Sequence, residues 1–192
     1  MGRMGAEDPA TASGRGPRLV APVAMAVVAS AGAGLHAAER ATIIQLRAPS
    51  LSARALESNA TELVAASPVP VLISSRCDIV VATSAAGVNL PERDIAVGDA
   101  RSLLGQRLIG RSVHSLEAAL QAERDSADFV IFGPVWTSES HADFAAAGVD
   151  ALAEVARALR IAVLAIGGVT EERIAECHAA GAAGYAAIRL FQ

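Results

Sequence analysis

The chain has 192 residues, of which 53% are hydrophobic and only 3% aromatic, so the sequence predicts one domain with an aliphatic core. A net charge of -4 argues against nucleic acid as a main partner, because such partners bind basic surfaces. The apolar run 19–35 contains Pro22 and follows an acidic segment, so we expect neither a membrane anchor nor an export signal. Cys77 and Cys177 lie far apart and fit buried thiols in a reducing compartment, so we expect a cytoplasmic protein.

Residues 1–17 are rich in glycine, proline and charge, and we expect them to form a flexible tail. Short apolar runs then alternate with segments of helical period. The runs span residues 19–28, 42–47, 69–74, 87–90, 107–113, 128–135, 161–169 and 184–191. The clearest helical segments span 115–126, 149–160 and 170–181, with Ser115 and Thr170 as candidate N-caps.

Several of the apolar runs are hydrophobic throughout, which is typical of parallel strands covered on both faces. Eight such repeats predict a compact (β/α)8 TIM barrel over residues 18–192. An open doubly wound sheet is the alternative, since periodicity does not reveal closure. No helical segment follows the eighth run, so we expect the last helix to be missing. A homodimer could cover that flank.

Functional residues of a parallel barrel lie at the carboxyl ends of its strands. Gly167 and Gly168 end the seventh run, where glycines let backbone N–H groups approach an anion. Loops after strands seven and eight are the usual phosphate cradle of such barrels, which adds Ala187 and Arg189 as phosphate-binding candidates. Arg47, after the second run, could also hold an anion at this mouth.

Polar residues also end other runs. Ser112 and His114 belong to the stretch GRSVHS, residues 110–115, which ends the fifth run; two residues apart on a strand, they would point the same way. His114 is a candidate acid or base, with a structural histidine as the alternative. Asp94, after the fourth run, is the single acid well placed for a metal.

The stretch GPVWTSESH follows the sixth run, and it is either a solvated loop or part of the site. Its Ser138, Ser140 and His141 could line the mouth, and Asp128 and Asp143 flank it. As part of the site it would be an anion-binding catalytic loop.

From Arg18 onward the chain resembles the thiamin phosphate synthase / TenI superfamily of small barrels. The resemblance is most specific in RLIGRSVHSLEAALQAERDSADFVIFGPV and VLAIGGVTEERIAECHAAGAAGYAAI. The first stretch is most similar to the TenI-like branch, the thiazole tautomerases, which move a proton on a thiazole phosphate carboxylate. The synthase branch joins thiazole phosphate to hydroxymethylpyrimidine pyrophosphate with Mg2+ and releases pyrophosphate.

The resemblance implies site residues and also shows departures. Gln45 and Arg47 match the synthase pattern QLREK, but Pro49 replaces its lysine; Asp94 and Ser112 also match. The synthase aspartate after strand three is Ser75, the histidine of HLGQED is Asn89, and the lysine of GPVFPTxTK is His141. The tautomerase histidine after the sixth strand is Pro134.

Three functions follow from this resemblance. The first is a thiazole tautomerase-type isomerase that binds a thiazole phosphate, needs no cofactor, and uses His141 or His114 as acid and base. The second is a thiamin phosphate synthase that requires Mg2+ at Asp94. The third is a non-catalytic thiazole phosphate binding or regulatory protein. We expect the isomerase.

Overall fold

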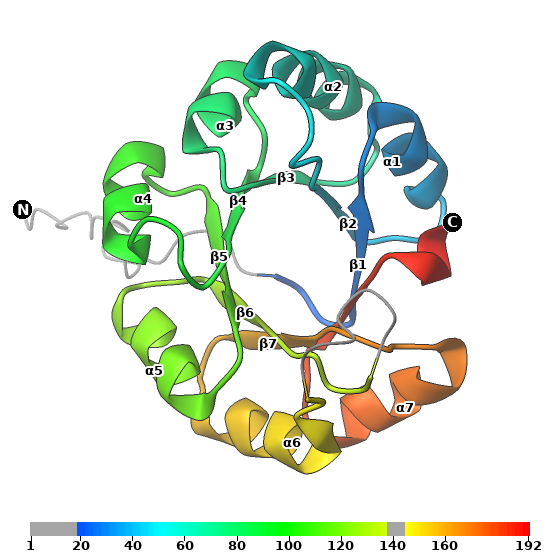
Figure 1. The fold of residues 1–192 in the computed structure, drawn as a ribbon, viewed down its shortest axis with the longest axis vertical. Coiled ribbons are helices and arrows are strands. Elements are labelled where there is room, and N and C mark those ends of the chain that lie inside the picture. The colour runs from blue at the N-terminus through cyan, green and yellow to red at the C-terminus, as the bar shows by residue number, and fades with distance from the viewer. Residues whose placement is uncertain (1–18, 138–144) are drawn as a thin grey trace, which may run out of the picture.

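The computed structural model describes residues 19–137 and 145–192, which form a closed barrel of eight parallel strands in the order β1 to β8. Strands and helices alternate along the chain, and the helices surround the barrel (Figure 1). β1 pairs with both β2 and β8, so the sheet has no free edge.

The elements are short, as expected for a small barrel. The strands are β1 Val23–Val28, β2 Ile43–Leu46, β3 Val71–Ser74, β4 Gly87–Leu90, β5 Leu108–Val113, β6 Phe129–Phe132, β7 Ala162–Ala165 and β8 Gly184–Ala187. The helices are α1 Ala31–Ala37, α2 Ala53–Ala66, α3 Cys77–Thr83, α4 Val97–Leu104, α5 Leu116–Arg124, α6 Gly148–Ala158 and α7 Glu171–Ala179, and a 3-10 turn, η2 Arg189–Phe191, follows β8.

Alternation along the strands divides the core in two. One cluster fills the barrel interior and consists of Val23, Met25, Val27, Ile43, Leu72, Leu108, Phe129, Ile131, Leu164 and Ala186. The larger cluster lies between the barrel and the helices and contains the other face of each strand, such as Ile44, Val88 and Val130. Strands such as β1 and β6 are therefore apolar on both faces, which explains their continuous apolar runs.

The interior has little spare volume beside β5 and β6. A Cβ placed on Gly110 would lie 2.1 Å from Cζ of Phe129, whose ring fills the space that a side chain on β5 would need. Phe129 is fully buried. A glycine on β5 thus accommodates one of the few aromatic side chains of the chain.

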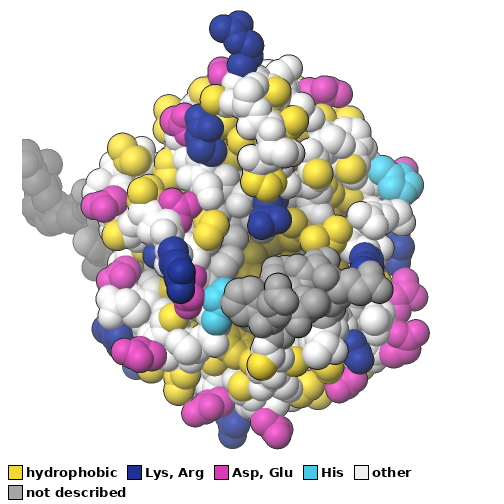
Figure 2. Space-filling model, viewed as in Figure 1, with side chains coloured by type: hydrophobic (Ala, Val, Ile, Leu, Met, Phe, Trp, Pro, Cys, Tyr) yellow, Lys and Arg dark blue, Asp and Glu magenta, His cyan; other side chains and the backbone are white. Residues whose placement is uncertain are grey.

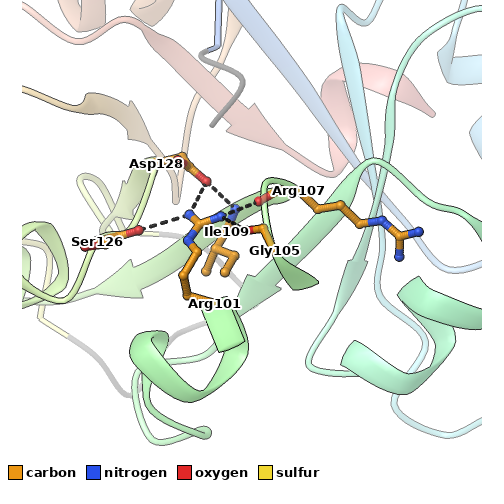
Figure 3. A network of polar contacts seen from close by, with 6 residues as sticks. All are labelled: Arg101, Gly105, Arg107, Ile109, Ser126 and Asp128. Atoms are coloured by element: carbon orange, nitrogen blue, oxygen red, sulfur yellow. Dashed lines mark hydrogen bonds and ion pairs between the residues drawn. The ribbon is translucent and has the colours of Figure 1, made fainter. Parts of the chain in front are cut away.

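An arginine-centred network ties together the amino-terminal end of the barrel between α4, β5 and β6 (Figure 3). The Arg101 guanidinium donates to the carbonyl oxygens of Gly105, Arg107 and Ser126 and to Asp128 Oδ2 at 2.7–3.0 Å. Asp128 Oδ2 also accepts from the backbone N–H of Ile109 at 2.7 Å. The sequence analysis was therefore wrong to place Asp128 beside the sixth loop, because this residue precedes β6 and lies at the opposite end of the barrel.

The predicted TIM barrel is confirmed, and the open-sheet alternative is wrong because β8 closes on β1. All eight predicted strands are present, and the three predicted helices occur within two residues of their expected ends. In the described part of the chain, η2 rather than a helix follows β8, in agreement with the expected missing last helix. The described helices are all too short or too polar to cross a membrane.

Two strand ends differ from the prediction. β7 ends at Ala165 because Gly167 and Gly168 have positive φ angles of 89° and 69°, which are incompatible with a strand. β8 ends at Ala187, and η2 then turns the chain so that the buried Phe191 ring stacks on Tyr185, with ring centroids 6.3 Å apart. Arg189 therefore lies in η2 and not in a strand.

Candidate functional site

The candidate site is the mouth of the barrel at the carboxyl ends of the strands. Figure 2 looks along the barrel axis onto this end and shows a hollow near its centre, lined mainly by hydrophobic side chains and bordered by basic ones. The chain contains no lysine, so all 16 of its basic residues are arginines. Any positive side-chain charge at the mouth, histidine aside, is therefore a guanidinium.

The anion loop, Ile166–Gly168, follows β7 and packs directly against the chain that leaves β6. The backbone N–H of Val135 donates to Ile166 O at 2.8 Å, and that of Trp136 donates to Gly167 O at 3.0 Å. A Cβ on Gly167 would lie 2.5 Å from Cβ of Pro134, and glycine is therefore required for both conformation and space. Gly167 and Gly168 therefore form a backbone loop at the barrel mouth, and binding of an anion there stays a prediction.

Two side chains that the sequence analysis missed border this loop. Arg173, in the first turn of α7, donates from NH1 to Gly168 O at 2.7 Å. Its guanidinium also lies over the Trp136 ring, 5.1 Å from the ring centroid. The sequence offered two indications: Arg173 lies five residues after Gly168, and Trp136 is the only tryptophan of the chain. The sequence pattern alone does not show that these two side chains are in contact.

A polar group lies inside the barrel near the mouth. Asn89 of β4 is 2% exposed, and its Nδ2 donates to Ser112 Oγ of β5 at 3.1 Å. Its Oδ1 is buried and has no hydrogen-bond partner among the described residues. Gln45 of β2 is 3% exposed and, two residues after the interior Ile43, also faces inward. These amides can orient a polar heterocycle.

Asp94 lies in the β4–α4 loop, which Arg111 holds in place by donating to the carbonyl oxygens of Glu92 and Ile95 at 2.9 and 2.8 Å. Asp94 Oδ1 accepts from the N–H of Ile95 at 2.8 Å. Burial raises the pKa of the Cys77 thiol, and the negative charges of Asp94 and Asp78 raise it further.

The donors here support Mg2+ only in part. Among residues 19–137 and 145–192, no cluster of three His, Cys, Asp or Glu side chains could hold a metal ion. Ser75, at the start of the β3–α3 connection, offers a hydroxyl where a second acid would strengthen a metal site. Mg2+ commonly binds through one or two carboxylates, waters and substrate phosphates, so Asp94 fits as the sole protein carboxylate if a diphosphate completes the shell.

His114 lies one residue beyond β5, so the prediction that it points the same way as Ser112 does not apply. Its Nδ1 forms a hydrogen bond with Gly133 O, and its backbone N–H donates to Glu92 Oε1 at 3.3 Å. A ring that donates from Nδ1 to a carbonyl leaves Nε2 as the basic nitrogen of the neutral form. His114 is exposed at the mouth and can exchange protons with a ligand there.

The remaining predicted residues are distributed as follows. Arg47 is exposed directly after β2, and its backbone N–H donates to Val28 O at 2.8 Å. Ala187 is buried with its side chain toward the helices, so it can offer only backbone atoms. Arg189 is exposed on η2. Ser138, Ser140 and His141 lie outside the described residues, as do Asp143 and the tail 1–17.

The described residues form a closed parallel barrel with a loop of two positive-φ glycines at its mouth. The thiamine monophosphate synthase family model matches residues 21–191. Thiamine-phosphate synthases of Chloroflexus aurantiacus and Chlorobium luteolum are 36% and 39% identical over 152 and 153 residues, 77% of this chain in both cases and 70% and 72% of those proteins. The solved thiamine phosphate pyrophosphorylase from Pyrococcus furiosus superposes with a TM-score of 0.79, at 27% identity, and covers 86% of this chain and 84% of that one.

The chain therefore belongs to the thiamine monophosphate synthase family. The superfamily resemblance drawn from the sequence is confirmed. The preference for the tautomerase branch is not, because the relatives carry synthase names.

Proposed function

We propose that the protein is a thiamine-phosphate synthase, which joins a thiazole phosphate to hydroxymethylpyrimidine pyrophosphate and releases pyrophosphate. The observation that carries the proposal is the similarity to named synthases across nearly the whole barrel, including its mouth. The TenI-like isomerase expected from the sequence becomes the second candidate.

In this proposal the two sides of the mouth bind different substrates. The anion loop, with Gly167 and Gly168, binds the phosphate of the thiazole through backbone N–H groups. Arg47 and Asp94, after β2 and β4, face the diphosphate of the second substrate. Mg2+, when bound at Asp94, would neutralise charge on the leaving pyrophosphate. Ser112, together with Gln45, contacts the heterocycle from the barrel interior.

Charge compensation is the weakest part of the match and makes the proposal testable. Pro49 and Ser75 stand where synthases of this family carry a lysine and a metal-binding aspartate. A leaving group of high negative charge depends on nearby cations. In this proposal Arg47, among the described residues, and the bound metal supply most of the positive charge that compensates the pyrophosphate. We expect a slow enzyme whose activity depends steeply on Mg2+.

The test measures thiamine phosphate formed from the two phosphorylated substrates with Mg2+. Removing Arg47 (Arg47→Met) or the metal ligand (Asp94→Asn) should lower kcat/KM by about 10²-fold or more, the size of effect seen for groups that stabilise transition-state charge. Arg157→Met is the control, because Arg157 lies in the last turn of α6, where it donates to Ala153 O of the same helix at 3.0 Å. Absence of product in the presence of both substrates and Mg2+ would refute the synthase.

The second candidate, a thiazole phosphate isomerase, is favoured by the His114 ring at the mouth and its hydrogen bond to Gly133 O. In that case the protein isomerises the thiazole phosphate without metal, and His114→Gln or His141→Ala removes the rate while the phosphate still binds. Tight binding of thiazole phosphate with neither activity supports the non-catalytic binding protein. The proposed synthase is cytoplasmic, which the free and buried Cys77 and Cys177 support.

A further inference from the structure

We propose that Arg173 and Trp136 form a latch that positions the Gly168–Val169 peptide of the anion loop for phosphate binding. In this proposal Arg173 acts as a positioning residue through the backbone, and Trp136 is the platform that holds it. The inference rests on the proposed binding of a phosphate at the anion loop, and it deepens that proposal by naming what sets the affinity.

The latch joins three elements. The Arg173 guanidinium comes from α7, contacts the Gly168 carbonyl at 2.7 Å, and covers the ring of Trp136 from the chain that follows β6. A charged donor makes a stronger hydrogen bond than a neutral one, and stacking on an indole restricts the guanidinium further. Arg173 is partly buried, so water competes less for both contacts.

The two carbonyl contacts fix the direction of the loop's N–H groups. In a trans peptide the C=O and the following N–H point in opposite directions, and cis bonds in the described chain occur only before Pro22 and Pro134. Gly167 O accepts from Trp136 N–H, so the Gly168 N–H points away from the β6 side. Gly168 O accepts from Arg173, so the Val169 N–H points away from that guanidinium.

Without the latch, the Gly168–Val169 peptide would lose the hydrogen bond from Arg173 that fixes its orientation. Gly167 and Gly168 both have positive φ angles, and glycine reaches many other conformations at little cost. A Cβ on Gly168 would lie 2.7 Å from Cβ of Trp136 and 2.8 Å from Thr137 O, so the loop is backed closely on that side. On the α7 side, Arg173 is the contact that holds the Gly168 carbonyl.

The latch also explains how a chain without lysine keeps a positive charge beside the loop. Arg173 contributes a full charge and a fixed geometry, and these two contributions can be separated. Arg173→Lys retains the charge but loses the planar donor fork that stacks on an aromatic ring. Arg173→Met loses both while keeping an unbranched side chain.

Trp136 provides a direct readout because it is the only tryptophan. Wild-type protein, Arg173→Met, Arg173→Lys and the control Arg157→Met are titrated with inorganic phosphate while tryptophan fluorescence is recorded. We expect Arg173→Met to weaken phosphate binding about tenfold, the loss of one charge-assisted hydrogen bond, and Arg173→Lys to recover part of it. The control should bind as the wild type does. Equal phosphate affinity in wild type and a folded Arg173→Met would overturn the latch.

The role of the Trp136 ring is tested by calorimetry, because variants at this position lack the tryptophan fluorophore. Trp136→Phe keeps an aromatic face and should bind phosphate more tightly than Trp136→Leu; equal affinities of the two contradict a role for the ring. With active enzyme, Arg173→Met should raise the KM for thiazole phosphate and leave kcat within about twofold, since the interaction is made in ground state and transition state alike. Loss of synthase activity in a protein that still shows the Arg173-dependent phosphate titration refutes the proposed function and leaves the latch intact.

Discussion

Asn89 holds a buried amide oxygen that no described group satisfies, inside the barrel near its mouth. Leaving a buried acceptor unpaired costs about 1–3 kcal/mol. Sites that break a folding rule in this way are expected where a ligand completes the contact. The neighbouring Ser112 hydroxyl holds the other end of the amide, so the unpaired oxygen has a fixed direction.

Replacement of Asn89 by leucine should separate stability from function. Asn89→Leu removes the unpaired acceptor and keeps the same branched side-chain skeleton, so the free energy of unfolding should stay equal or rise by about 1 kcal/mol. The KM for the pyrimidine or thiazole substrate should rise about tenfold, because a ligand loses its partner. Denaturant unfolding and steady-state kinetics give the two readouts. A variant that is both less stable and fully active would show that Asn89 serves packing alone.

Among the elements, α4, β5 and β6 depend on the Arg101 network, whose ion pair is only 23% and 12% exposed for Arg101 and Asp128. A side chain that satisfies three carbonyl groups and one carboxylate closes the loops that follow α4 and α5. This network lies at the end of the barrel away from the mouth. Its effect should therefore be on stability and not on chemistry.

Arg101→Met should lower the free energy of unfolding by about 3 kcal/mol, because it leaves Asp128 partly buried without its cation. Thiamine phosphate formation at 25 °C should change less than twofold, since the mouth is untouched. Urea denaturation measures the first quantity. Asp128→Asn is the matched variant: it keeps an oxygen for the Ile109 N–H and should cost less than Arg101→Met. A larger loss for Asp128→Asn would mean that the Asp128 carboxylate contributes more to stability than the contacts of Arg101 with the three carbonyl groups.

The α7 helix carries a thiol that gives a pH signature. Burial raises the pKa of Cys177 to about 11, from 9.0 for an ordinary thiol. Above pH 9 the thiol ionises in the unfolded chain but stays protonated in the folded one, so stability falls between about pH 9 and pH 11 and then levels off. The loss should reach at most about 3 kcal/mol, since each of the two pKa units corresponds to about 1.4 kcal/mol. Cys177→Ala should flatten this part of the stability profile relative to wild type; identical profiles for the two proteins would contradict it.

The parallel sheet could be predicted from the sequence because strands such as β1 and β6 are apolar on both faces. Eight repeats favoured a barrel, but the apolar pattern alone does not show closure. The glycines of the anion loop were also predictable, because glycine is the residue type that adopts positive φ angles without a steric cost. Contacts between side chains distant in the sequence were not, as Arg173 and Trp136 show. Strand ends were least predictable: His114 lies past the end of β5, so the alternation rule failed there.

Closure of the barrel predicts that its two halves unfold together. The chain has two cysteines, both free and buried, with Cys77 in α3 of the first half and Cys177 in α7 of the second. Because β1 pairs with β8 and β4 with β5, neither half keeps a complete sheet when the other unfolds. The single-cysteine variants Cys77→Ala and Cys177→Ala, labelled with a thiol reagent along a urea gradient, should expose the remaining thiol at the same midpoint as the loss of circular dichroism. Each variant's own dichroism curve corrects for any change in its stability. A half-barrel that opens on its own would be revealed by labelling of one cysteine at a urea concentration about 1 M or more below the dichroism midpoint. For typical slopes this difference corresponds to about 1–3 kcal/mol of unfolding free energy.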